Sequence, residues 1–137
     1  MNLEVYFVDS FTDEVFSGNA AGVVFHSGEV SPSLMQNIAF ENNLSETAFV
    51  DVTKNNEIKF YSPEVEVDLC GHATLASAFV YFNFINKESN EIIFNSNRGQ
   101  LIAKRNDNAI TMSLPKDHPK KESNINIFND ALGCNVA

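Results

Sequence analysis

The sequence predicts an α+β fold in which a mostly antiparallel barrel of strands surrounds one buried central helix. The first observation is the run ATLASAFVYFNFI at residues 73–85, which leaves no polar stripe wide enough to face water. A helix that is apolar on all sides is a buried helix. The second is that the flanking segments contain roughly six to eight short apolar stretches separated by turn residues, a pattern typical of strands. The economical arrangement wraps these strands around the helix.

Two strands are predicted at the start of the chain. Residues 3–9 (LEVYFVD) bring Leu3, Val5 and Phe7 to one side, because successive side chains of a strand alternate between its faces. Residues 21–26 (AGVVFH) follow the turn-prone SGN and predict the second strand.

A helix is predicted over residues 32–42. Ser31 is a good N-cap, and the proline that follows it fits the first turn, where its missing N–H costs nothing. Apolar side chains then recur four residues apart, and the asparagine pair at 42–43 can close the helix in a left-handed turn.

The remaining strands are predicted to form a hairpin and a meander. ETAFVDV (46–52) and EIKFYS (57–62) flank the turn-prone TKNN and predict an antiparallel hairpin. The tail at 125–137 predicts a short helix or a linker. The meander comprises three segments separated by the NRG and NDN turns, EIIFNS (91–96), GQLIAKR (99–105) and AITMSL (109–114).

Length and composition predict one domain. The 137 residues are 44% hydrophobic, enough to bury a core, so residues 1–119 are expected to form one lobe and 120–137 a tail or inter-lobe linker. The net charge of −9 argues against a nucleic-acid partner. No signal peptide is evident and no apolar run reaches the ~20 residues that span a bilayer, so we expect a cytoplasmic protein without a membrane partner. Cys70 and Cys134 are then expected to be free thiols.

The first candidate site is the tripeptide Cys70-Gly71-His72, directly before the predicted central helix. The positive end of the helix dipole there favours an anion, and Gly71 lets a carboxylate approach the backbone closely. The same field is expected to lower the pKa of the Cys70 thiol toward thiolate and make it a candidate proton acceptor. The alternative is purely structural, with Cys70 a small core residue and His72 a cap.

Glu46 and Asn19 are the other candidates. If residues 44–50 form a strand, Glu46 shares a face with Ala48 and Val50, which places a carboxylate on the apolar side, where it can carry a proton. In the alternative, the strand begins after Glu46 and the residue is a surface charge. The Gly18-Asn19 turn precedes a strand, and its amide can donate to a substrate carboxylate.

No metal or cofactor site is predicted. Cys70 and His72 have only His26, His118 and Cys134 as sequence partners, and these are distant and lack ligand spacing. A phosphate-binding loop is absent.

Four blocks of the sequence together resemble the PhzF-like (phenazine biosynthesis-like) isomerase family, over residues 3 to about 119. They are VDSFTDEVFSGNAAGVV, NLSETAFV, FYSPEVEVDLCGHATLASA and GQLIAKRNDNAITMSLP, in the family's order. The resemblance implies that Glu46 is the catalytic proton carrier and that Gly71 and His72 contribute to substrate binding and proton handling. It also implies a diaminopimelate-epimerase-like fold of two similar lobes, each a strand barrel around a helix, with the active site in the cleft between them.

Two departures from the family pattern leave three hypotheses. The family's second lobe contributes an aspartate and a Gly-Ser turn that this sequence does not contain. The Cys70-Gly71-His72 tripeptide also resembles that of proline-racemase relatives, in which the cysteine is a catalytic base. The leading hypothesis is an isomerase lobe in which Glu46 moves a proton on a small carboxylate-bearing substrate without a cofactor. The alternatives are an amino-acid racemase or epimerase that depends on Cys70, and a truncated lobe that catalyses nothing.

A homodimer is expected in each case. A lone lobe exposes the rim around Asn19, Glu46 and residues 70–72, and uncovered apolar surface at such a rim marks an association site. A second copy of the chain can cover it, because a two-fold interface lets one patch meet itself.

Overall fold

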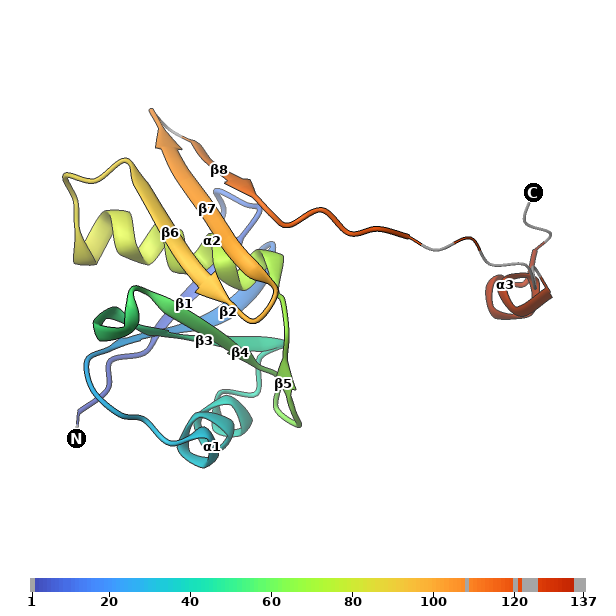
Figure 1. Cartoon of the computed structure of the whole chain (residues 1–137), viewed down its shortest axis with the longest axis horizontal. Coiled ribbons are helices and arrows are strands. Elements are labelled where there is room, and N and C mark those ends of the chain that lie inside the picture. Colours follow the sequence, from blue (N-terminus) through green and yellow to red (C-terminus); the bar gives the residue numbers. More distant parts are fainter. Residues whose placement is uncertain (1, 108, 120, 122–125, 135–137) are drawn as a thin grey trace.

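The chain folds into one mixed sheet that curls as a half-barrel around a central helix, α2 (Gly71–Val80), as Figure 1 shows. The computed structural model describes residues 2–107, 109–119, 121 and 126–134. The strands follow the order β1-β2-β3-β4-β6-β7-β8, and β5 pairs with β4. Their bounds are β1 Tyr6–Ser10, β2 Asn19–His26, β3 Glu46–Asp51, β4 Glu57–Tyr61, β5 Glu66–Val67, β6 Glu91–Ser96, β7 Gly99–Asn106 and β8 Ala109–Ser113.

Most strand pairings are antiparallel, as predicted. The β3–β4 hairpin closes through a short 3-10 turn at Val52–Lys54, and β6, β7 and β8 form the predicted meander. Two pairings are parallel, β2 with β3 and β4 with β6. Both need a crossover, which α1 (Pro32–Asn42) supplies for the first and α2 for the second. The sheet is therefore mixed.

Helix α1 confirms the residues 32–42 predicted for it. The Ser31 side chain accepts a hydrogen bond from the Leu34 N–H at 3.2 Å, and Asn43 closes the helix in the left-handed region at φ 51°. Its buried residues, Met35 and Ala39, pack on the face of the sheet opposite to α2. The sheet segment β2–β4 is therefore covered on both faces, which fixes the strands that carry the candidate site.

The prediction that residues 73–85 are buried on all sides is wrong for part of the run. Ala73, Ala76 and Phe82 are fully covered, whereas Phe79 is 43% and Phe84 56% exposed. The half-barrel covers the helix from one side and leaves a stripe of α2 open between the two edge strands. The last turn is also irregular, because residues Tyr81–Ile85 form a π-helix.

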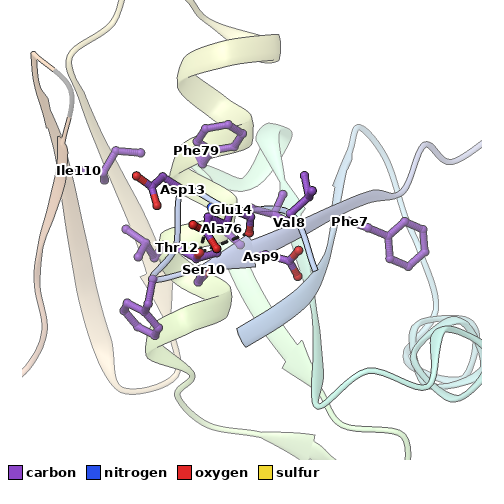
Figure 2. Close-up of a pocket in the computed structure, with 13 residues that line it drawn as sticks. Phe7, Val8, Asp9, Ser10, Thr12, Asp13, Glu14, Ala76, Phe79 and Ile110 are labelled. Carbon is purple, nitrogen blue, oxygen red and sulfur yellow. Dashed lines mark hydrogen bonds between the residues drawn. The ribbon is translucent and has the colours of Figure 1, made fainter. Parts of the chain in front are cut away.

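The open stripe is a pocket of about 540 Å³ between β1 and β8. Figure 2 shows it beside the loop that follows β1, with Asp13 and Glu14 next to Phe79 of α2 and Ile110 of β8. In the described part of the chain, β1 and β8 each pair on one side only, so the predicted barrel is a half-barrel. Phe7 is 65% exposed, and its ring points away from α2.

The inner face of β1 is formed instead by Tyr6 and Val8, which pack against the core around α2. Residues 3 and 5, which lie before β1, pack with the α1 side. Phe7 lies between Tyr6 and Val8 and so faces away from α2, on the side where residues 3 and 5 also pack, which agrees with the predicted alternation of Leu3, Val5 and Phe7.

The tail contains a short helix, α3 (Asn126–Leu132), as predicted, and Figure 1 shows it apart from the sheet. Within the described residues, no helix has both the length and the apolar character to cross a bilayer. Cys70 and Cys134 are both free thiols, as predicted, the first buried and the second exposed.

Candidate active site

Glu46 is the first residue of β3, and its side chain belongs to the face that packs on α2. It pairs in register with Ala21 of β2. Residues two and four positions further, Ala48 and Val50, are fully buried in the core around α2. The Glu46 side chain is 23% exposed. The alternative in which the strand starts after Glu46 is therefore wrong, and the carboxylate lies at the rim of the core.

His72 meets this carboxylate from the first turn of α2. Its Nε2 lies 3.3 Å from Glu46 Oε2, and its side chain is only 10% exposed. The Ser45 hydroxyl lies 3.3 Å from the same nitrogen. Buried Ser10, at the end of β1, donates to the His72 carbonyl at 2.8 Å. The Ser45 hydroxyl thus contacts the imidazole beside Glu46, and Ser10 holds the His72 backbone in place.

Cys70 lies on the other side of the imidazole. Its Sγ is 3.3 Å from His72 Nδ1, and the residue is 6% exposed. Burial, as the largest cause, and the nearby Glu46 carboxylate together raise the pKa of the Cys70 thiol from 9.0 to about 11, against the lowering effect of the backbone N–H groups of Ala73 and His72. The predicted lowering of this pKa is wrong, because desolvation and the Glu46 charge outweigh the field at the helix terminus.

Gly71 leaves the helix terminus accessible. A Cβ at this position would have Leu114 Cδ1 at 3.9 Å as its nearest neighbour, which is ordinary van der Waals contact. Internal packing therefore does not require a glycine here. Because the first N–H groups of a helix lack acceptors within it, the open backbone at Gly71 offers donors to an anion.

Asn19 lies at the edge of the same cluster. Gly18, at φ 90°, makes the turn before it, and a Cβ there would clash with the Ser10 carbonyl oxygen at 2.3 Å. Ser45 Oγ lies 3.4 Å from both Asn19 Oδ1 and the Ala20 carbonyl oxygen. The Ser45 hydroxyl therefore links Asn19 to His72, and the fold brings together the five predicted residues, Asn19, Glu46, Cys70, Gly71 and His72.

Two residues of the cluster were not predicted as site residues. Ser45 directly precedes Glu46 in the LSETAF block, and this adjacency was the available signal. Ser10 has no such signal, because its contact with His72 spans 62 positions of the sequence. The fold also supplies what the sequence spacing lacked, since ligand atoms of Glu46, Cys70 and His72 all lie within 4.8 Å of one another.

The pocket between β1 and β8 does not contain the Glu46–His72 pair. It lies between β1 and α2 and shares only Ser10 with the cluster. Its lining is mostly apolar with three carboxylates, Asp9 of β1 and Asp13 and Glu14 of the loop that follows it. We place the candidate active site at the Glu46–His72 pair, because that is where a carboxylate, an imidazole and a helix terminus converge.

Comparison with known proteins identifies relatives over most of the chain. The phenazine biosynthesis-like (PhzC-PhzF) family model matches residues 8–131. An uncharacterised isomerase of Pseudomonas aeruginosa is 40% identical over 97% of this chain and 51% of its own length. The phenazine biosynthesis-like domain-containing protein of Bos taurus is 35% identical over 97% of this chain and 50% of its own length.

Solved structures give the same result. A PhzC/PhzF protein from Clostridium difficile superposes with a TM-score of 0.83 at 42% identity, over 97% of this chain and 52% of its own. A PhzF family protein from Enterococcus faecalis gives 0.82 at 39%, with the same coverage. The chain thus spans about half the length of the relatives that it matches. It belongs to the phenazine biosynthesis-like (PhzC-PhzF) family, whose members include isomerases by name.

Proposed function

We propose that this chain is a proton-transfer lobe that isomerises a small carboxylate-bearing substrate, with Glu46 as the proton carrier. The observation that carries the proposal is the 3.3 Å approach of Glu46 Oε2 to His72 Nε2 at the N-terminus of α2. A carboxylate and an imidazole in contact can pass a proton between them, and general acid–base catalysis requires groups positioned in this way.

The chemistry begins with a C–H bond next to a carbonyl or carboxylate of the substrate. Glu46 takes the proton, and the electron pair of the broken bond delocalises onto the substrate oxygens. The backbone N–H groups at Gly71 and the positive end of α2 stabilise this negative charge. Glu46 or His72 then returns the proton to a different carbon, so that atoms and charge balance. Such a step requires no cofactor, since only positioned acids and bases take part.

Cys70 orients the His72 ring in this proposal and is not the base. Its raised pKa, about 11, keeps the thiol protonated near neutral pH, which argues against the racemase alternative in which Cys70 is the base. The 3.3 Å contact of the thiol with His72 Nδ1 instead orients the ring.

The epimerase-like fold is a part of the same proposal, and a predicted epimerase from Pseudomonas aeruginosa shares the fold with a TM-score of 0.67 at 17% identity.

A homodimer is the second part of the proposal. Exposed apolar side chains lie near residues of the site in sequence or in space: Phe11, Phe16, Leu69 and Leu114. Leu69 directly precedes Cys70, and a Cβ at Gly71 would have Leu114 Cδ1 at 3.9 Å as its nearest neighbour. Because such a rim is costly to leave in water, we propose that a second copy covers it and excludes water from the cleft.

Solvent-deuterium exchange tests the proton-transfer step. The full chain is incubated in D2O with a panel of small unsaturated, 2-amino and 2-hydroxy carboxylates, and NMR follows the loss of C–H signals. Glu46→Gln should slow the exchange at least ~100-fold, since it keeps the shape and removes the proton carrier. Cys70→Ser should leave exchange within about threefold of the parent.

The thermal midpoints of both variants are the control and should lie close to that of the parent. Undiminished exchange in Glu46→Gln would reject Glu46 as the carrier. Loss of exchange in Cys70→Ser alone would favour the racemase alternative, and absence of exchange with the whole panel would favour the non-catalytic lobe.

A further inference from the structure

Three different metal-ligand types converge at the candidate active site. One ligand atom each from Glu46, Cys70 and His72 lies within 4.8 Å of the other two. In the described part of the chain, this is the one group of three or more such side chains. Cys70 is buried, and the other two are half-buried, so the cluster is not a set of surface acids.

The spacing within the cluster suits a tetrahedral ion. Zn²⁺ binds sulfur, nitrogen and oxygen at about 2.0–2.3 Å, so two ligands on one ion lie about 3.3–3.6 Å apart. The distance from Cys70 Sγ to His72 Nδ1 is 3.3 Å. Glu46 Oε2 lies 3.3 Å from His72 Nε2, and the ligand atoms of the three residues are within 4.8 Å of one another, so a rotation of the Glu46 side chain would bring its carboxylate to the ion as the third ligand.

The other nitrogen of the imidazole already has an outer partner. Metal-binding histidines donate their second ring N–H to a nearby acceptor, which fixes the ring. If Nδ1 of His72 binds the ion, Nε2 is the donor; Ser45 Oγ and Glu46 Oε2 each lie 3.3 Å from it, and Ser45 remains as its acceptor when Glu46 turns to the ion. Ser45 in turn has Asn19 Oδ1 and the Ala20 carbonyl oxygen at 3.4 Å as acceptors. Ser10, which binds the His72 carbonyl at 2.8 Å, holds the backbone.

The charge and ligand chemistry favour a thiophilic cation. Among the described residues, Glu46 forms an ion pair with His72 and none with a lysine or arginine. The chain carries a net charge of −9, which attracts cations. A thiolate, an imidazole and a carboxylate in tetrahedral array select Zn²⁺ over Mg²⁺ or Ca²⁺.

We infer that the triangle of Glu46, Cys70 and His72 binds one Zn²⁺ ion, and that the bound ion switches off proton transfer. Binding releases the Cys70 thiol proton to the buffer and forms the S–Zn bond. Glu46 and His72 can then no longer transfer a proton, because both are ligands of the ion. The inhibition rests on the proposed function, whereas the binding itself does not.

Cobalt is the probe for binding, because a thiolate bound to tetrahedral Co²⁺ gives an intense near-ultraviolet charge-transfer band. The titration uses the full chain with Cys134→Ser, which removes the other thiol. One equivalent should bind and be displaced by one equivalent of Zn²⁺. Cys70→Ser in this background should abolish the band, and Glu46→Gln should weaken affinity at least ~10-fold. His118→Asn, a histidine in an exposed loop outside the cluster, is the matched control and should bind as the parent does.

The outcomes separate the two proposals. The proposed metal site is wrong if the Cys134→Ser protein shows no band, or if Co²⁺ binds equally well with and without Cys70. Cys70→Ala is the second variant, to be used if Cys70→Ser unfolds at a lower temperature than the parent. If the site binds Zn²⁺ but the bound ion leaves the rate of deuterium exchange unchanged, the proposed inhibition is wrong. Binding by a protein that exchanges no substrate supports the metal site and rejects the proposed function.

Discussion

Glu46 Oε2 and His72 Nε2 lie 3.3 Å apart although the two residues belong to different elements, β3 and α2. The pair forms because β3 begins at the level of the first turn of α2, so that the first side chain of the strand meets the helix terminus. Ser45 on one side and Cys70 on the other fix the imidazole between them. Substitutions of the residues around this pair test the roles assigned to them.

Gly71→Ala should weaken carboxylate binding at least ~10-fold while leaving the fold intact. The added methyl group meets only Leu114 Cδ1 at 3.9 Å, and alanine is the better helix former, so the free energy of unfolding should stay equal or rise slightly. The methyl group would, however, occupy the space above the amides that we assign to an anion. NMR titration with acetate and succinate, followed at the amides of residues 71–73, measures the affinity. Equal affinity in both proteins contradicts an anion site at this terminus.

Phe82→Ala should destabilise the protein by about 3–5 kcal/mol, because the ring is fully buried and the truncation leaves a cavity. Phe79→Ala is the matched control on the same helical run. That ring is 43% exposed in the open stripe, so its loss should cost only about 1–2 kcal/mol. Urea unfolding at low protein concentration measures both. Equal destabilisation would show that the stripe is covered in solution.

Cys70 should react slowly with iodoacetamide at neutral pH and faster as the pH approaches its pKa of about 11. The rate is measured in metal-free Cys134→Ser protein, with the exposed Cys134 in Cys70→Ser as the comparison. Because the pKa is raised from 9.0 in the folded state, the thiol stabilises the fold below about pH 9 and this contribution is lost as the pH rises toward 11. A half-maximal alkylation rate below pH 9 contradicts the assigned burial and carboxylate effects.

Sedimentation equilibrium at micromolar concentration should give the mass of a dimer, twice 15.2 kDa. Leu114→Lys and Phe16→Glu place charges in the apolar rim and should shift the equilibrium toward monomer, whereas Phe40→Glu, on exposed α1 surface away from that rim, should not. A strictly monomeric parent rules out the dimer. If neither Leu114→Lys nor Phe16→Glu weakens the dimer, the two copies are in contact through another surface.

The sequence determined the local elements and the inward face of the key strand. Helix α1, the β3–β4 hairpin and the β6–β8 meander were predictable because periods of 3.6 and 2 residues and the turn residues act over short distances. The same alternation placed Glu46 on the side of Ala48, and the four sequence blocks indicated the family that comparison confirms.

The tertiary structure decided what depends on distances between separate elements. An apolar run has the same local pattern whether strands cover it on every side or on one, so the exposure of Phe79 follows only from the half-barrel. The Cys70 pKa has the opposite direction to that predicted from a helix terminus, because burial and the Glu46 carboxylate oppose that field. The triangle of Glu46, Cys70 and His72 likewise depends on the register of β3 against α2, which no spacing in the sequence contains.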